Sequence, residues 1–302
     1  MGNAIANLRV TPLGDTLGAQ VHGVDLSEPM DAALRDALVD AWLRHIVLLF
    51  RGQSLSPAEQ IDAARIFGEP QAPAAAKFYE AQGQKQNDVD RHIMVISNLG
   101  PDGLPALQND GLGSGEVQWH SDNSYVASPP AGSLLYSLEI PPQGGDTFFC
   151  NQYAAYETLS DTMKARIGPL KARHDASRNS AGVLRPGLIA PETPEDVPGP
   201  DHPLVRIHPQ TGRPALYLGR RRDYPSQFII DMPMAESEAL LDELWAHATA
   251  PRFVWRHQWQ LGDAVLWDNR AAMHYREPHD PSHRRIMHRV QIAGDAVRGS
   301  SA

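Results

Sequence analysis

The sequence contains a single cysteine, Cys150, among its 302 residues, so no internal disulfide can form. An unpaired cysteine fits a reducing compartment, and its neighbours Phe148 and Phe149 predict a thiol buried in a strand. The sequence also lacks a long hydrophobic run, and the longest, at residues 46–50, is far too short to span a bilayer. The first residues show no basic segment followed by an apolar one. We therefore expect no signal peptide and a cytoplasmic protein without a membrane partner.

An excess of positive charge is missing as well. Lys and Arg together number 27 against 36 Asp and Glu, which gives a formal net charge of −9. This charge argues against nucleic acid as a partner. The hydrophobic content of 42% and the charged content of 21% are those of an ordinary globular protein. We expect one domain over residues 1–302, with a helical N-terminal part at about 1–90 and a β core at about 91–295. The sequence does not determine the oligomeric state, and a homo-oligomer is one possibility.

The order of the predicted elements favours a mainly β fold. Asp31 is a predicted N-cap of a helix that runs to about His45, and Ser56 begins a capping box for a helix that should end at Gly68. Residues 183–203 contain six prolines and predict a loop or insertion. The predicted late strands, at residues 252–258, 263–267 and 285–293, have no helices between them, which disfavours a parallel βαβ sheet. A double-sheet jelly roll with helical insertions fits better.

The segment Trp119-His120-Ser121-Asp122 supplies two candidate metal ligands. On a strand, His120 and Asp122 would point to the same face, because side chains alternate with a period of two. The best candidate for a third ligand is His274, which follows Trp267-Asp268-Asn269-Arg270. Two His and one carboxylate leave open positions on a metal, an arrangement that suits Fe(II) used with O2. Alone, His-x-Asp is a weak signal in a chain with 13 His.

Two further motifs suggest anion binding. Arg285 and Arg289 share one face of a predicted strand, where inward guanidinium groups would be costly unless each met an anion. The alternative is that the arginines of this segment are solvated or pair with Asp263, Asp268 or Asp280. In Gly144-Gly145-Asp146-Thr147 the glycines allow a close approach to a ligand, and Thr147 could offer a hydroxyl. A simple hairpin turn explains the same residues.

These motifs, in this order, resemble the Fe(II)/2-oxoglutarate-dependent dioxygenases of the taurine and 2,4-dichlorophenoxyacetate dioxygenase (TauD/TfdA) family. The similarity runs from about Val47 to about Asp295. It is carried by Val47-Leu48-Leu49-Phe50-Arg51-Gly52-Gln53, Trp119-His120-Ser121-Asp122, Gly144-Gly145-Asp146-Thr147, Ala154-Ala155-Tyr156, Pro203-Leu204-Val205-Arg206, Trp267-Asp268-Asn269-Arg270 with His274, and Arg285 with Arg289.

The resemblance implies a double-stranded β-helix (jelly roll) and a set of residue roles. It assigns Fe(II) to His120, Asp122 and His274. It assigns 2-oxoglutarate to Arg285 and Thr147, and the acidic group of the substrate to Arg289. The implied reaction hydroxylates a small organic acid with O2 and releases succinate and CO2. Iron halogenases of this general type lack the carboxylate ligand, so Asp122 favours hydroxylation.

Departures from the family pattern bear on the substrate. Pro70-Gln71-Ala72-Pro73 stands where the taurine enzymes have a His-rich stretch, and Glu116 stands where they have an Asn, which argues against taurine. After Asp102-Gly103, where the 2,4-dichlorophenoxyacetate enzyme has a Lys, this chain has Leu104. Recognition of a carboxylate would then depend on Arg289, with Lys77 and Arg220, Arg221 or Arg222 as further candidates. We expect an aryloxyalkanoate-type or other carboxylate first, and a sulfonate or alkyl sulfate second.

Two hypotheses from other classes compete with a dioxygenase, and the first of them uses the same three ligands. A Zn(II) hydrolase would activate a metal-bound water and would need neither Arg285 nor Thr147. A non-catalytic jelly roll that binds an anion or metal would bind 2-oxoglutarate without releasing succinate in air. Succinate release and the effect of Arg285→Ala separate these readings from a dioxygenase.

Overall fold

The computed structural model describes residues 5–74, 76, 80, 87–100, 102–105, 113–179, 182–221 and 225–300. Its α-helices are α1 (Ala32–His45), α2 (Pro57–Arg65), α4 (Gln152–Glu157), α5 (Asp161–Ile167) and α6 (Met234–Ala248). The largest sheet contains β1 (Arg9–Pro12), β2 (Ala19–His22), β3 (Val47–Phe50), β4 (Pro70–Gln71), β5 (Ile93–Ser97), β7 (Gly132–Glu139), β15 (Ala264–Asp268) and β17 (Ile286–Ile292). A smaller sheet contains β6 (Val117–His120), β8 (Thr147–Asn151), β14 (Val254–His257) and β16 (Ala272–Arg276). Short outlying strands are β9 (Lys171–Arg173), β10 (Asp201–Pro203), β11 (Val205–Ile207), β12 (Pro214–Leu216) and β13 (Phe228–Ile229).

Side-chain caps fix the starts of the first two helices, as the sequence predicts. The Asp31 carboxylate accepts a hydrogen bond from the Leu34 amide at 2.8 Å. Ser56 and Glu59 form a reciprocal capping box before α2. The predicted end of α2 at Gly68 is wrong, because the helix ends at Arg65. After it, amides bond to carbonyls three residues back, which tightens the chain into a turn.

The larger sheet has the order β1-β2-β3-β15-β7-β17-β4, and β5 also pairs with β17. β2 and β3 run parallel, and the other neighbours run antiparallel. Leu48 and Phe50 pack with α1 and α2, whereas Val47 and Leu49 pack toward the smaller sheet. Both faces of this sheet are therefore covered, which explains the continuous apolar run of β3.

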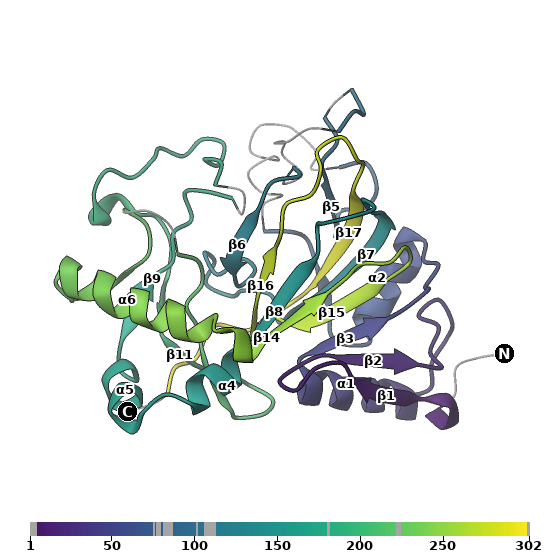
Figure 1. Ribbon diagram of the computed structural model, residues 1–302, viewed down its shortest axis with the longest axis horizontal. Coiled ribbons are helices and arrows are strands. Elements are labelled where there is room, and N and C mark those ends of the chain that lie inside the picture. The colour runs from purple at the N-terminus through teal and green to yellow at the C-terminus, as the bar shows by residue number, and fades with distance from the viewer. Residues whose placement is uncertain are drawn as a thin grey trace.

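The smaller sheet, ordered β14-β8-β16-β6, faces the larger one (Figure 1). Its inner face contributes Phe149 to a core that contains Trp267 and Met287 of the larger sheet. Its outer face contributes Cys150 and Met273 to a second core, together with leucines of α6. The prediction that Cys150 is buried in a strand is thus confirmed.

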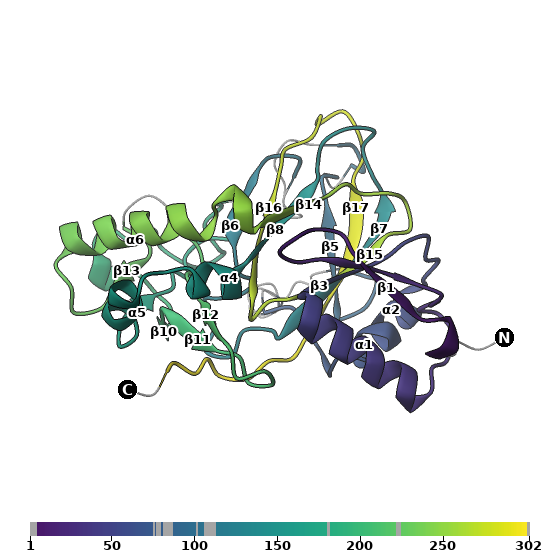
Figure 2. The same ribbon diagram turned by 60° about the horizontal axis from the view of Figure 1, so that its bottom comes forward.

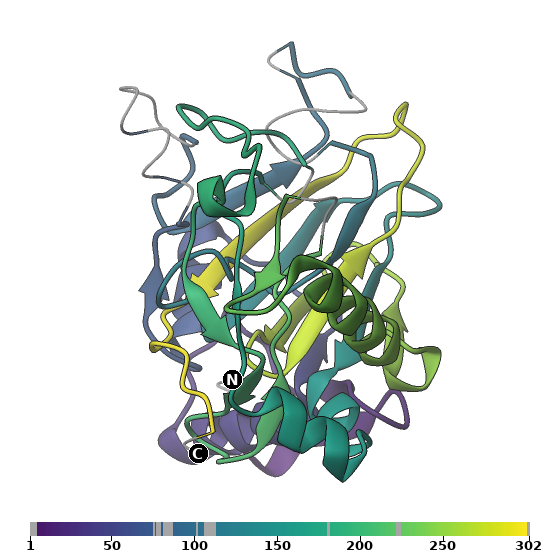
Figure 3. The same ribbon diagram turned by 90° about the vertical axis from the view of Figure 1, so that its left-hand side faces the viewer.

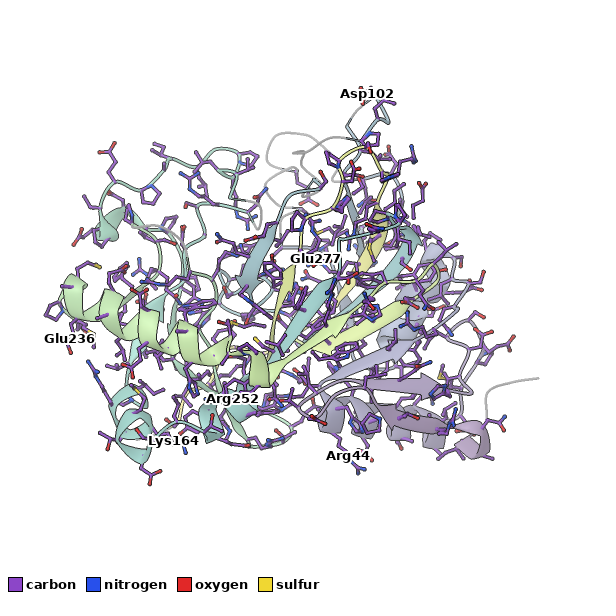
Figure 4. All side chains as sticks on the ribbon, viewed as in Figure 1. Arg44, Asp102, Lys164, Glu236, Arg252 and Glu277 are labelled. Carbon is purple, nitrogen blue, oxygen red and sulfur yellow. The ribbon has the colours of Figure 1, made fainter. Side chains whose placement is uncertain are left out.

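The two sheets lie between two groups of helices. Helices α1 and α2 lie on one side of the molecule, and α4, α5 and α6 lie on the other (Figures 2 and 3). Charged side chains such as Arg44, Lys164 and Glu236 lie on the periphery (Figure 4). No helix within the described ranges is both long and apolar enough to cross a bilayer.

Strand β16, which carries His274, is absent from the strands that the sequence predicts. Four of its five residues are buried, so its burial does not alternate. A strand that is covered on both faces lacks the polar/apolar alternation by which half-buried strands are recognised. Its inner face also carries His274 and Arg276, so the apolar run that would indicate a buried strand is missing too.

Candidate active site

Two histidines face each other on adjacent strands of the smaller sheet. His120 ends β6, and His274 lies opposite it on β16. The centroids of the imidazole rings are 4.1 Å apart. The register shifts between His274 and Arg276, which marks an irregularity of the bulge type. Bulges redirect side chains, and here both Val117 and His120 of β6 reach the same cavity.

Asp122 completes the cluster from just beyond the end of β6, not from the strand as expected. Its Oδ1 atom lies 3.7 Å from His120 Nε2 and 3.9 Å from His274 Nε2. Donors that each lie about 2.1 Å from one ion are roughly 3–4 Å from each other. The three predicted ligands therefore converge, and one ligand atom from each lies within 4.8 Å of the others.

Asn269 and Ser133, which belong to other segments of the chain, hold Asp122 in place. The side chain of Asn269 accepts a hydrogen bond from the Asp122 amide at 2.7 Å and donates one to the Asp122 carbonyl at 2.9 Å. The Ser133 hydroxyl donates to Asp122 Oδ2 at 2.8 Å. The main chain and one carboxylate oxygen are thus fixed, so that Oδ1 points toward the two histidines.

The protonation states of the cluster are those of metal ligands. Burial, and next the charge of Arg220, lowers the pKa of His120 to about 4. Burial also lowers the pKa of His274 well below its ordinary value. Burial alone would raise the pKa of Asp122, but the charges of Arg289 and the histidines bring it well below its usual range. Two neutral imidazoles and one carboxylate are the forms that bind a divalent cation, so this donor set fits Fe(II).

A cavity of about 40 Å³ adjoins the cluster. His120, His274 and Thr147 of the smaller sheet line it, and so do three arginines, Arg276, Arg285 and Arg289. A concave space with converging polar groups is the usual form of a small-molecule site. Both sheets therefore contribute polar side chains to one cavity.

Arg285 is buried immediately before β17, with 2% of its surface exposed. Burial, and next the charge of Arg276, lowers its pKa well below the ordinary value. The charge of Asp146 opposes this lowering of the Arg285 pKa. The Asp146 carboxylate, however, is already paired with Arg256 at 2.8 Å. A bound anion would relieve the cost of burying this guanidinium.

The alternative reading of the arginine segment holds only for Arg284, which is exposed but pairs with Glu139 at 2.7 Å. Arg289 is buried and faces the site from β17. Its Nη1 atom donates to Asp122 Oδ1 at 2.7 Å. Arg289 therefore lies within contact distance of the predicted metal site.

The Gly144-Gly145 turn packs against Arg285. Both glycines have positive φ angles, 76° and 73°. A Cβ atom on Gly145 would lie 3.4 Å from Arg285 Nε. Thr147, which follows this turn, accepts a hydrogen bond from the Trp259 indole at 3.0 Å, so its own hydroxyl proton can be donated. The turn is therefore both a tight turn and a close approach to the guanidinium.

The Trp267-Asp268-Asn269-Arg270 segment connects β15 of the larger sheet to β16 of the smaller one and contains a buried ion-pair network. Asp268 accepts two hydrogen bonds from the Arg270 guanidinium, at 2.8 and 2.7 Å. Its Oδ2 atom also lies 2.9 Å from His208 Nε2. Asp268 and Arg270 therefore form a buried ion pair, which stabilises the chain where β15 leads into β16.

Of the other candidates from the sequence, Arg220 lies beside His120, and the rest lie apart from the site or outside the described residues. Arg221 pairs with Glu238 and Asp242 of α6, and Glu116 accepts a hydrogen bond from the Tyr275 hydroxyl. Arg220 forms an isolated bridge with His120. Lys77 and Arg222 lie outside the described residues.

Sequence reasoning missed three side chains of the site region. They are Ser133, Arg276 and Tyr125, and the Arg185 guanidinium carbon lies 4.0 Å from the centroid of the Tyr125 ring. Burial raises the pKa of Tyr125, and the charges of Arg289 and Asp122 contribute to the net shift, which places Tyr125 near the site. The one available signal was the position of Arg276, two residues after a predicted ligand.

Comparisons with known proteins agree with this geometry. The family described as "Taurine catabolism dioxygenase TauD, TfdA family" matches residues 9–291. The chain is 35% identical over 296 residues to (S)-phenoxypropionate/alpha-ketoglutarate-dioxygenase of Sphingobium herbicidovorans, covering 95% of each chain. It is 34% identical over 289 residues to alpha-ketoglutarate-dependent 2,4-dichlorophenoxyacetate dioxygenase of Cupriavidus pinatubonensis, covering 95% of this chain and 98% of the relative.

A solved structure shares the fold over nearly the whole length. The crystal structure of AAD-2 in complex with Mn(II) and N-oxalylglycine superposes with a TM-score of 0.82 at 31% identity, and the match covers 96% of this chain and 99% of the other. The chain therefore belongs to the TauD, TfdA family and is a 2-oxoglutarate-dependent dioxygenase that uses Fe(II) and O2.

Proposed function

We propose that this dioxygenase hydroxylates a small organic acid of the aryloxyalkanoate type. Hydroxylation of the carbon beside the ether oxygen gives a hemiacetal, which collapses to a phenol and a carbonyl compound. One O2 and one 2-oxoglutarate are consumed, and succinate and CO2 are released. Two of the relatives are named for phenoxypropionate and 2,4-dichlorophenoxyacetate, and both names describe aryloxyalkanoates.

One observation carries the assignment of roles: a His-Asp-His cluster and buried guanidinium groups share one cavity. His120, Asp122 and His274 would hold Fe(II), which supplies the activation of O2 when bound. Arg285 and Thr147 would bind 2-oxoglutarate. Arg289 would bind the substrate carboxylate, because it is the guanidinium that contacts the metal-ligand cluster directly.

The cavity must enlarge when a 2-oxo acid binds. A volume of about 40 Å³ holds roughly three or four water molecules at about 10–15 Å³ each. Arg289 lines this cavity and is bonded to Asp122 Oδ1. A metal ion on Oδ1 would compete with that bond. Release of the Arg289 side chain would open space and free a guanidinium for the substrate acid.

The architecture supports a single catalytic unit. We propose that the two facing sheets are those of a double-stranded β-helix, and that residues 1–302 form one domain. Strands β1 to β4, from the first part of the chain, join the same sheet as β5, β7, β15 and β17. The Pro-rich segment at residues 183–203 would be an insertion outside the two main sheets.

Succinate release across a panel of acids tests the substrate class. Anaerobic Fe(II) and 2-oxoglutarate should give a weak visible charge-transfer band with the protein. After air is admitted, 2-phenoxypropionate or phenoxyacetate should stimulate the release of succinate and phenol. Phenoxyethanol, which lacks the carboxylate, is the matched control and should not stimulate release. Stimulation only by an alkyl sulfate or a sulfonate would replace the aryloxyalkanoate proposal.

A variant tests the role of Arg289. Arg289→Ala should keep the charge-transfer band but lose the preference for phenoxyacetate over phenoxyethanol, because no guanidinium is left to pair with the acid. An unchanged preference would remove Arg289 from substrate recognition.

Two rival functions predict different results. A Zn(II) hydrolase would keep its activity in Arg285→Ala, and a non-catalytic binding protein would bind 2-oxoglutarate without succinate release.

A further inference from the structure

Arg276 places a second guanidinium group beside Arg285. It follows His274 by two positions on β16, so both side chains lie on the inner face of the strand. Across the sheet, Arg276 pairs with Thr147 of β8 and with Val117 of β6. Arg276, Arg285 and Thr147 all line the same cavity.

The two buried guanidinium groups act on each other electrostatically. Both are buried, and the charge of Arg276 contributes to the lowered pKa of Arg285. Arg276 donates a hydrogen bond to the Gly115 carbonyl, which is a neutral acceptor. His279 is also buried nearby, and burial, followed by the charges of Arg285 and Arg276, lowers its pKa to about 4. The acidic group that acts on Arg285 is Asp146, whose carboxylate is bound by Arg256.

A carboxylate is the ligand that such an arrangement favours. Its two oxygens offer about four lone-pair positions, enough for a guanidinium fork, a second guanidinium and a hydroxyl. Two buried like charges on one cavity repel each other, and an anion between them converts this cost into attraction. The far carboxylate of 2-oxoglutarate supplies one negative charge at the end of a short chain.

We propose that Arg276 is a second guanidinium ligand of the far carboxylate of 2-oxoglutarate, acting with Arg285 and Thr147. The proposal rests on the assignment of the cosubstrate to Arg285 and Thr147 in the proposed function. It makes Arg276 a residue that selects dicarboxylic over monocarboxylic 2-oxo acids. Binding of the near carboxylate and the keto oxygen, which would face the metal ligands, should not depend on Arg276.

Paired ligands test this selectivity by direct binding. Mn(II)-loaded protein is titrated calorimetrically with 2-oxoglutarate and with 2-oxopentanoate, in which a methyl group replaces the far carboxylate. Arg276→Ala should weaken 2-oxoglutarate binding by about tenfold to a hundredfold, as expected for a charged hydrogen bond. The affinity for 2-oxopentanoate should change less than about twofold by the same reasoning, because that ligand has no group for Arg276.

Two more variants separate charge from structure. Arg276→Gln can still donate to the Gly115 carbonyl but lacks the charge, and it should lose 2-oxoglutarate affinity like Arg276→Ala. Arg284→Ala removes an exposed arginine adjacent to Arg285 in sequence and should bind both ligands as the wild type does. Circular dichroism and thermal melting check that each variant is folded.

The outcomes distinguish this inference from the proposed function. Equal weakening of both ligands, or an unchanged affinity for 2-oxoglutarate, would overturn the role of Arg276. If Arg285→Ala leaves 2-oxoglutarate binding intact, the cosubstrate assignment on which the inference rests is wrong. Succinate release by the wild type is measured separately, so failure of Arg276 alone leaves the dioxygenase reaction and its substrate class standing.

Discussion

Ser133→Ala should weaken metal binding without disrupting the fold. The Ser133 side chain is fully buried, and its hydroxyl donates to Asp122 Oδ2 at 2.8 Å. A hydrogen bond to a charged group contributes about 1.5–3 kcal/mol. Loss of the donor leaves that oxygen unpaired, so the carboxylate can rotate away from the two histidines. Removal of such an outer partner typically costs about 10–100-fold in metal affinity.

Mn(II) binding, measured by titration with electron paramagnetic resonance, tests this magnitude. Ser137→Ala is the matched control, because Ser137 is buried on the same strand, β7. Its hydroxyl donates to the Gln260 carbonyl at 2.7 Å and accepts from the Asp263 amide at 2.9 Å. Both variants should lose stability, by about 1–3 kcal/mol for a buried hydrogen bond. Wild-type Mn(II) affinity in Ser133→Ala, or an equal loss in both variants, would refute the reasoning.

Three other perturbations have definite expected outcomes. Asp268→Asn leaves the buried Arg270 and its neighbour His208 without a carboxylate, so urea denaturation should show a loss of about 3–5 kcal/mol; a loss below 1 kcal/mol would contradict the network. Arg256→Ala frees Asp146 from its 2.8 Å ion pair, and Asp146 can then neutralise Arg285, so calorimetry should show severalfold weaker 2-oxoglutarate binding. The metal-free protein should lose stability between pH 6.5 and about 4, because burial lowers the pKa of His279 to about 4 from 6.5. In that interval the unfolded state binds more protons, so the free energy of unfolding falls as the pH falls. Thermal melts at several pH values should show that the stability of His279→Gln declines less steeply with falling pH than that of the wild type. Identical slopes would count against the role of His279 in this pH dependence.

The sequence was sufficient to predict the helices and strands that depend on interactions between residues close together in the chain. The caps at Asp31 and Ser56 predict the starts of α1 and α2, because each cap bonds to an amide three residues ahead. The apolar run at residues 46–50 predicts β3, and the burial of both faces explains why it lacks alternation. The His-x-Asp motif and the later His274 predict a shared metal, and the spacing of Arg285 and Arg289 predicts inward guanidinium groups. Residue types and the period of a strand suggest these interpretations, and the resemblance to a known family favours them over their alternatives.

The three-dimensional arrangement decided what depends on contacts between distant segments. Strand β16 is buried on both faces because one face packs against α6 and the other against Trp267 of the larger sheet. No local sequence pattern records these contacts. Asp122 lies beyond its strand and is aimed by Asn269, 147 residues away, and by Ser133 of the facing sheet. Arg276 lies beside Thr147 and Arg285 because β16, β8 and the residue just before β17 meet at one cavity. The sequence by itself determined which ligands and cations the chain carries; only the tertiary structure determined which of them meet, because long-range sheet pairing sets the distance between them.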